Sequence, residues 1–201
     1  MKKLTKYEAN IQSRGLFRYL LGLLVRWKKN ILYAKARNIA RRNGAIVGQG
    51  VIISVSLAKR LNSNCRIGNN VSIQTDKIDT RAPLNIGNNV IIGDGCEIIT
   101  ASHNIDSPDW EMKTYGLIIE DYVWIPTKVL ILPSCRKICR GAVIGSGSVL
   151  VKNVDPMSVV SGNPAKEIRK RQCVHSNIVV SSLLGGDYEE YKKARKLNTK
   201  K

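Results

Sequence analysis

Ile67-Gly68-Asn69-Asn70-Val71 and Ile86-Gly87-Asn88-Asn89-Val90 are the same five residues, met twice along the chain. Around both copies a large aliphatic residue recurs every six positions. This period fits neither a helix nor a single strand, so we interpret it as a short strand plus a turn, three of which close one coil of an all-β solenoid, a parallel β-helix. The recurring residues are Leu61, Ile67 and Ile73; Ile86, Ile92 and Ile98; Ile119, Ile125 and Ile131; and Ile138, Ile144 and Leu150.

A second, smaller residue lies four positions after most of these aliphatics and is expected to fill the interior beside them. Cys65, Cys96 and Cys135 occupy this slot, so we expect them to be buried, and Ser102 falls in the same slot. Gly and Asn fill the positions between, as sharp corners require. Because no second Cys/His pair completes a zinc set with Cys135 and Cys139, we expect no metal site.

The six-residue spacing stops between Ile98 and Ile119. The intervening segment is polar and rich in turn residues, and it contains His103 and Asp106. A loop extruded from a regular solenoid has no packing reason to exist, so it is the natural place for function. We therefore expect an active-site loop over about residues 99–118.

The repeats resemble the hexapeptide-repeat acyltransferases, whose fold is a left-handed parallel β-helix, over roughly residues 46–171. The resemblance is strongest in residues 118–125 (IIEDYVWI), 141–149 (GAVIGSGSV) and 159–166 (VVSGNPAK). The last two motifs, in this order, are typical of the branch that uses acetyl-coenzyme A on sugars. Residues 100–108 (TASHNIDSP) are similar to members that acetylate exopolysaccharide or lipopolysaccharide units, such as colanic-acid acetyltransferases, with galactoside and maltose acetyltransferases as further relatives.

The resemblance implies an acetyl-coenzyme A-dependent O-acetyltransferase that acts on a saccharide in surface polysaccharide synthesis. It also implies a homotrimer with active sites between subunits. His103 matches the catalytic base, a task that suits imidazole near neutral pH, and Trp124 and Asp106 are expected beside the acceptor. Coenzyme contacts are expected, position by position, at Thr127, Ser146, Val151, Lys152, Lys166 and Arg169.

Two departures from the repeat fall in the same region. The family usually has Trp-Ile-Gly where this chain has Trp-Ile-Pro at 124–126, and proline donates no backbone hydrogen bond. The amide of Thr127, the expected oxyanion donor, is retained. Ile131 and Ile138 are seven residues apart where six are expected, which predicts a small bulge at 136–137.

The charge of the chain is concentrated outside the repeats. The 201 residues carry 33 Lys or Arg against 15 acidic residues, a net charge of +18 with a pI near 10.0. Such a balance is typical of nucleic-acid or acidic-membrane binders. However, the first 45 residues account for +11 and residues 46–165 for only +1. With 5% aromatic residues as well, we expect no nucleic-acid partner.

The two ends are predicted to be helical. Apolar residues recur at helical spacing among basic residues in an N-terminal arm, 1–45, and the tail, 172–201, contains a short charged helix. Two interpretations of the basic stretch 15–37 stay open: packing on its own domain or a neighbouring subunit, and contact with an anionic membrane surface. In the absence of a signal peptide or an apolar span, we expect a cytoplasmic protein, in the second case on the inner face of the membrane.

Two other functions remain open at this stage. An N-acetyltransferase acting on an amino sugar would use the same cosubstrate and the same base. A non-catalytic, membrane-associated trimeric scaffold would need neither His103 nor Trp124. The sequence does not name the acceptor sugar or the position that is acetylated.

Overall fold

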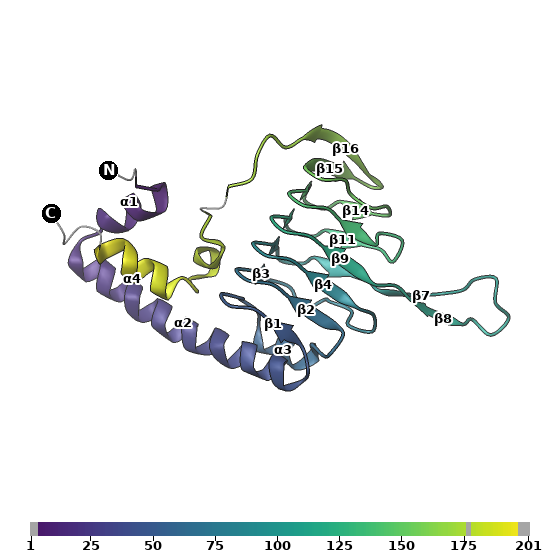
Figure 1. Cartoon of the computed structure of the whole chain (residues 1–201), viewed down its shortest axis with the longest axis horizontal. Helices are drawn as coiled ribbons and strands as arrows, with labels where there is room; N and C mark the ends of the chain where they lie inside the picture. The colour runs from purple at the N-terminus through teal and green to yellow at the C-terminus, as the bar shows by residue number, and fades with distance from the viewer. Residues whose placement is uncertain (1–3, 176–177, 197–201) are drawn as a thin grey trace.

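The computed structural model describes residues 4–175 and 178–196. Helices gather at one end of the molecule and stacked strands at the other (Figure 1). Within the described residues, none of the helices is long and apolar enough to cross a membrane. The helices are α1 (Lys6–Gln12), α2 (Leu16–Arg42), α3 (Val55–Arg60), the 3₁₀ helix η1 (Val180–Leu184) and α4 (Tyr188–Lys196).

Short parallel strands form three sheets, which the chain visits in rotation. One sheet holds β1 (Ile46–Val47), β2 (Cys65–Ile67), β4 (Leu84–Ile86), β9 (Leu117–Ile119) and β12 (Lys137–Ile138). A second holds β3 (Ser72–Ile73), β5 (Ile91–Ile92), β10 (Trp124–Ile125), β13 (Val143–Ile144), β15 (Ser158–Gly162) and the antiparallel β16 (Ala165–Lys170). The third holds β6 (Glu97–Ile98), β11 (Leu130–Ile131) and β14 (Val149–Leu150).

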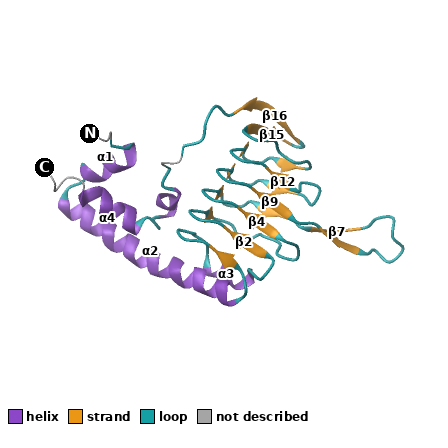
Figure 2. Ribbon diagram, in the orientation of Figure 1, coloured by secondary structure: helices purple, strands orange, loops and turns teal. Residues whose placement is uncertain are grey.

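We call these sheets A, B and C. A coil contributes one strand to each sheet, as β9, β10 and β11 do, and the coils stack along the molecule (Figure 2). This arrangement agrees with the predicted parallel β-solenoid, with helical segments before and after it. One further pair, β7 (Ala101–His103) and β8 (Met112–Thr114), forms an antiparallel hairpin outside the three sheets.

The repeated Ile-Gly-Asn-Asn-Val motif shapes one column of corners. A Cβ on Gly68 would lie 2.7 Å from the carbonyl oxygen of Gly87 on the next coil, so only glycine fits there. The first asparagine links coils through its side chain, because the Oδ1 of Asn88 accepts the backbone N–H of Asn69 at 2.8 Å. The second, Asn70, adopts a φ of +55°, a left-handed conformation that asparagine tolerates well.

The interior confirms the six-residue pattern. All twelve aliphatic residues of the series are at most 4% exposed, and Cys65, Cys96 and Cys135 are at most 2% exposed. The prediction for Ser102 is wrong, since this residue is exposed. The chain leaves the coil before it reaches Ser102. Thr100 is still buried, whereas Ser102 belongs to strand β7 of the hairpin.

The predicted bulge at 136–137 is also wrong. Lys137 and Ile138 pair in regular register with β9. The extra residue is accommodated at the preceding corner, where the Oδ1 of Asn153 accepts the N–H groups of Arg136 and Lys137 at 2.7 and 2.9 Å.

Both ends of the chain meet in a unit of α1, α4 and the first half of α2, which we call the helical clasp. The carboxylate of Asp187, which is fully buried, forms an ion pair with Arg26 at 2.9 Å and accepts the hydroxyl of Tyr7 at 2.5 Å. Burial and the hydrogen bond to Asp187 raise the pKa of Tyr7 far above its usual value. Tyr191 stacks on Tyr19 with 5.1 Å between ring centroids. The clasp therefore joins residues more than 160 positions apart.

Candidate active site

The β7–β8 hairpin is the largest departure from the coil. It leaves the stack between β6 on sheet C and β9 on sheet A, and it projects on the side away from the helices (Figure 1). Its first residue, Ala101, is buried against the solenoid, whereas His103 is exposed. The hairpin thus carries the predicted catalytic histidine out of the core and into reach of other molecules.

The ring of His103 is oriented by a backbone carbonyl. Its Nδ1 lies 2.6 Å from the carbonyl oxygen of Trp110. A carbonyl only accepts hydrogen bonds, so the hydrogen bond assigns the proton of the neutral ring to Nδ1 and leaves the lone pair of Nε2 available. Trp110 adopts a φ of +49°, and its N–H donates to Ser107 at 3.1 Å. This tight turn aims the Trp110 carbonyl at the histidine.

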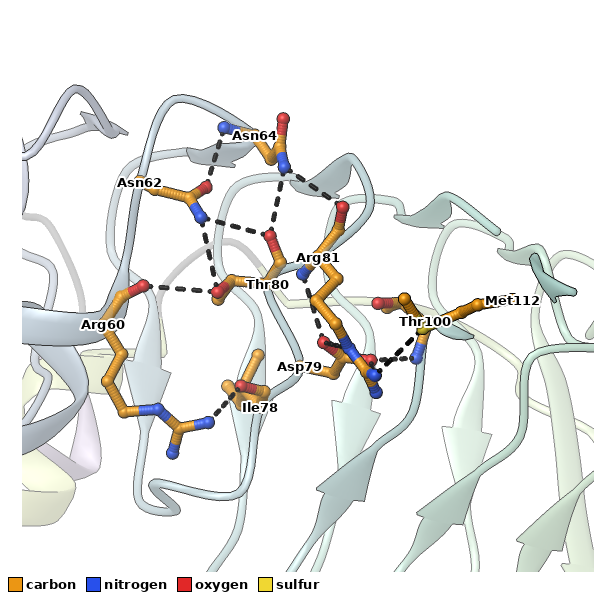
Figure 3. Close-up of polar contacts among 9 residues, drawn as sticks. All are labelled: Arg60, Asn62, Asn64, Ile78, Asp79, Thr80, Arg81, Thr100 and Met112. Carbon is orange, nitrogen blue, oxygen red and sulfur yellow. Dashed lines mark hydrogen bonds and ion pairs between the residues drawn. The ribbon is translucent and has the colours of Figure 1, made fainter. Parts of the chain in front are cut away.

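The root of the hairpin rests on a carboxylate of the preceding coil. Asp79 accepts the N–H of Thr100 at 3.1 Å and a two-pronged contact from Arg81, at 2.8 and 2.9 Å (Figure 3). Arg81 also reaches the sulfur of Met112 on β8, at 3.5 Å. Burial alone would raise the pKa of Asp79, but the hydrogen bonds from Arg81 and from the backbone hold it well below its usual range. Asp79 is therefore ionised at neutral pH.

The segment that carries Asp79 is itself tied to the coil before it. Asn62 and Asn64 donate side-chain hydrogen bonds to the carbonyl of Thr80 at 3.2 and 3.1 Å, and Arg60 donates to the carbonyl of Ile78 at 3.0 Å (Figure 3). These contacts connect successive coils, so the hairpin is anchored to the rigid part of the molecule through Asp79.

Removing this carboxylate is expected to loosen the hairpin. Asp79→Ala leaves the N–H of Thr100 and the guanidinium of Arg81 without their acceptor. Amide hydrogen exchange over residues 100–115 should then become about fivefold faster or more, the factor that ~1 kcal/mol of lost hydrogen bonding gives. Asp109→Ala, which removes an exposed acid of the same hairpin, should leave exchange unchanged. Equal exchange in Asp79→Ala and wild type would contradict this anchoring role.

The predicted acceptor residues lie on different elements. Trp124 is on β10 of sheet B, 48% exposed, and it lines a small pocket with Arg171 and His175. Asp106 lies near the exposed tip of the hairpin. Within one chain, His103 and Trp124 therefore occupy separate parts of the surface. His175, which lines the same pocket, is exposed.

The predicted coenzyme residues follow the corners of the last coils. Thr127 and Ser146 both lie at the turn from sheet B to sheet C, and the N–H of Gly147 donates to the carbonyl of Thr127 at 3.0 Å. Lys166 and Arg169 are exposed on β16, the edge strand of sheet B. Val151 and Lys152 follow β14 and lie at another corner, the turn from sheet C to sheet A.

The backbone N–H of Thr127 has no hydrogen-bond partner among the described residues. Thr127 itself is exposed. Pro126 before it accepts at its carbonyl oxygen from the buried thiol of Cys96, with 2.7 Å between the atoms. The proline is thus held from inside the coil, and the peptide N–H that follows it has no partner in the described chain.

No family model matches the chain. WcaF of Escherichia coli K12, assigned by its name to colanic acid biosynthesis as an acetyltransferase, is 27% identical over 146 residues, which cover 72% of this chain and 80% of that protein. The chain is thus similar in sequence to this acetyltransferase and, as the solved structures below show, in fold to hexapeptide-repeat acetyltransferases. Two other curated acetyltransferases match over a shorter stretch, and the chain spans only 44% and 51% of their lengths.

Two solved structures share the fold of this chain. One is a hexapeptide-repeat acetyltransferase of Vibrio cholerae complexed with acetyl-coenzyme A, with a TM-score of 0.53, 24% identity, and coverage of 83% of this chain and 84% of that one. The other is a maltose O-acetyltransferase of Clostridium difficile 630, with a TM-score of 0.55, 24% identity, and coverage of 84% and 90%. At this identity the likeness concerns the fold.

Sequence reasoning missed the residues that hold the site in place. Asp79, Arg81 and Trp110 belong to no motif of the family resemblance. One signal was available, since Asp79 lies 21 residues before Thr100, a separation close to one coil. The six-residue spacing alone could not reveal it, because the turn that carries Asp79 does not keep that spacing.

Proposed function

We propose that this protein transfers an acetyl group from acetyl-coenzyme A to a hydroxyl group of a saccharide in surface polysaccharide biosynthesis. The observation that carries the proposal is His103, exposed on the hairpin with Nδ1 bound to the Trp110 carbonyl and Nε2 free. The names of the relatives, a colanic acid acetyltransferase and a maltose O-acetyltransferase, support a saccharide acceptor. The complex of the Vibrio cholerae protein supports acetyl-coenzyme A as cosubstrate.

In the proposed mechanism, Nε2 of His103 takes the proton of the acceptor hydroxyl as its oxygen attacks the thioester carbon. The hydrogen bond from Nδ1–H to the Trp110 carbonyl stabilises the imidazolium that forms. The free N–H of Thr127 holds the oxyanion of the tetrahedral intermediate. The carbon–sulfur bond then breaks, and the imidazolium returns its proton to the departing coenzyme thiolate.

The cosubstrate and acceptor are proposed to lie along the corners of the last coils. Lys152, Lys166 and Arg169 are exposed cations that suit the coenzyme phosphates, and Ser146 and Val151 would contact its apolar and amide parts. Trp124 and Asp106 would flank the saccharide. The left-handed sense of the coil and the limits of the catalytic domain, 46–171, belong to the same proposal, which the folds of the two solved relatives support.

We also propose a homotrimer with active sites between subunits. Because His103 and Thr127 occupy different parts of one chain, and the hairpin projects beyond the stack, a histidine would meet the coenzyme residues of a neighbouring copy (Figure 1). Light scattering of the purified protein should give about three times the 22.3 kDa chain mass. A monomer that retains full activity would contradict the shared site.

The test of function is release of free thiol from acetyl-coenzyme A in the presence of a panel of acceptors. The panel contains neutral oligosaccharides and the matching amino sugars. It also contains chloramphenicol, because several similar proteins carry the name chloramphenicol acetyltransferase. Acceptor-dependent release with neutral saccharides supports the proposal. Release with amino sugars alone would identify an N-acetyltransferase. If none of the acceptors caused release of thiol, a non-catalytic scaffold would be favoured.

A further inference from the structure

Helix α2 exposes an apolar face that no other part of the described chain covers. Its buried residues, Tyr19, Ala36 and Ala40, lie on the side that packs against the rest of the protein. At about 100° of rotation per residue, seven large apolar residues fall within an arc of roughly 140° on the other side. These residues, each between 48% and 77% exposed, are Phe17, Leu20, Leu21, Leu24, Trp27, Ile31 and Leu32.

The same arc contains unpaired positive charge. Lys28 and Lys35 are exposed within it, and neither makes a hydrogen bond or an ion pair with any residue that the structure describes. Arg26 and Lys29 of the same helix are engaged elsewhere, Arg26 with Asp187 and Lys29 with the carbonyl of Leu184. We call the seven apolar residues with Lys28 and Lys35 the outer face of α2.

Exposed apolar side chains beside unpaired lysines favour an anionic lipid surface over a second copy of the helix as the partner. Helix α2 contains no acidic residue from Leu16 to Arg42. If two copies paired through their outer faces, lysines would meet lysines with no carboxylate on either helix to compensate, and like charges in contact repel. A bilayer surface with anionic lipid offers both missing components, acyl chains for the apolar residues and negative headgroups for the cations.

We propose that the outer face of α2 binds an anionic lipid surface, with the helix axis parallel to the membrane plane. The apolar residues enter the boundary between headgroups and acyl chains, and Lys28 and Lys35 contact the headgroup phosphates. The β7–β8 hairpin lies at the opposite end of the molecule and stays clear of the membrane (Figure 1). The inference does not depend on acetyl transfer, because lipid binding requires no substrate.

The test is co-sedimentation of the full-length protein with vesicles of phosphatidylcholine alone and with one third phosphatidylglycerol. Wild type should pellet with the anionic vesicles and remain largely in solution with the neutral ones. The double variant Leu24→Glu, Ile31→Glu should lower the partition coefficient on anionic vesicles by about tenfold or more. The double variant Lys28→Ala, Lys35→Ala should lower it by about tenfold as well, and salt should reduce wild-type binding.

A matched control is Ile168→Glu, which places the same charge on an exposed isoleucine of β16, and vesicle binding should not change. The lysine double variant substitutes exposed, unpaired residues and is expected to fold as wild type, so it tests the proposal even if the glutamate variant does not fold. Equal binding of wild type and both double variants would overturn the proposal. It would also be overturned if the glutamate variant lowered the mass in light scattering without changing vesicle binding, since the face would then be a contact between copies.

Discussion

Replacing His103 with alanine is expected to lower kcat for acetyl transfer by about 10²- to 10⁴-fold, the usual contribution of a positioned general base. The side chain is exposed, and its single described hydrogen bond is the one to the Trp110 carbonyl. Its removal should therefore leave the solenoid intact. The residues proposed to hold the coenzyme lie on other elements, so the Kd for acetyl-coenzyme A should not change. Thiol release gives kcat, and calorimetric titration gives Kd.

The matched control is His175→Ala. His175 is the other histidine of the chain, exposed, with its Nε2 3.5 Å from the sulfur of Cys173. It lines the pocket beside Trp124, so it tests whether any imidazole near the acceptor site suffices. We expect kcat close to that of wild type. If His103→Ala kept wild-type turnover and His175→Ala lost it, the assignment of the base would be wrong.

Replacing Asp187 with alanine is expected to destabilise the helical clasp by about 3–5 kcal/mol, the cost of breaking one partner out of a buried charge pair. The carboxylate is fully buried and joins three segments, through Arg26 of α2, Tyr7 of α1 and the start of α4. Its loss leaves the Tyr7 hydroxyl without its acceptor and the Arg26 guanidinium with only the carbonyl of Gly22, at 3.3 Å. Hydrogen exchange in α1 and α4, followed with increasing urea, measures the change in free energy of unfolding.

The exposed Glu189, two residues further along α4, provides the control for this prediction. Glu189→Ala removes the same charge from the same segment but breaks no buried contact, so the free energy of unfolding of the clasp should change little. Protection of the solenoid strands should stay high in both variants, because their core is separate from the clasp residues. Equal protection of α4 in Asp187→Ala and wild type would contradict the role of the ion pair.

The regular part of the fold could be predicted because its cause is local and repeated. Every interior position of the series places the same kind of side chain in the same environment, and Ile92, Ile119 and Ile131 are fully buried as expected. The prediction failed where the chain leaves that rule. Ile78 is fully buried and bridges to Ile98 on sheet C, yet it lies five residues after Ile73 and the pattern did not include it.

The candidate site could be predicted only in part, for a different reason. His103 was identified by its place in a polar loop and by the family resemblance. The contacts that orient it depend on a left-handed turn at Trp110 and on Asp79, one coil away. Asp187 contacts Tyr7 across 180 residues of sequence. No periodicity or motif announces contacts of this kind, since they arise only when distant segments are folded together.

The helical clasp can form only late in synthesis of the chain, because its helices lie near opposite ends of the sequence. Helix α4 begins at Tyr188, 146 residues after α2 ends at Arg42. At ribosomal rates of about 5–20 residues per second, roughly 7–30 s separate the synthesis of the two helices. Each coil needs only its neighbouring coils to fold, so the solenoid can form during this interval. Tyr19 has no stacking partner until Tyr191 has been synthesised. A nascent chain therefore carries two uncovered apolar sides of α2, and the completion of α4 covers the side of Tyr19 while the outer face stays exposed.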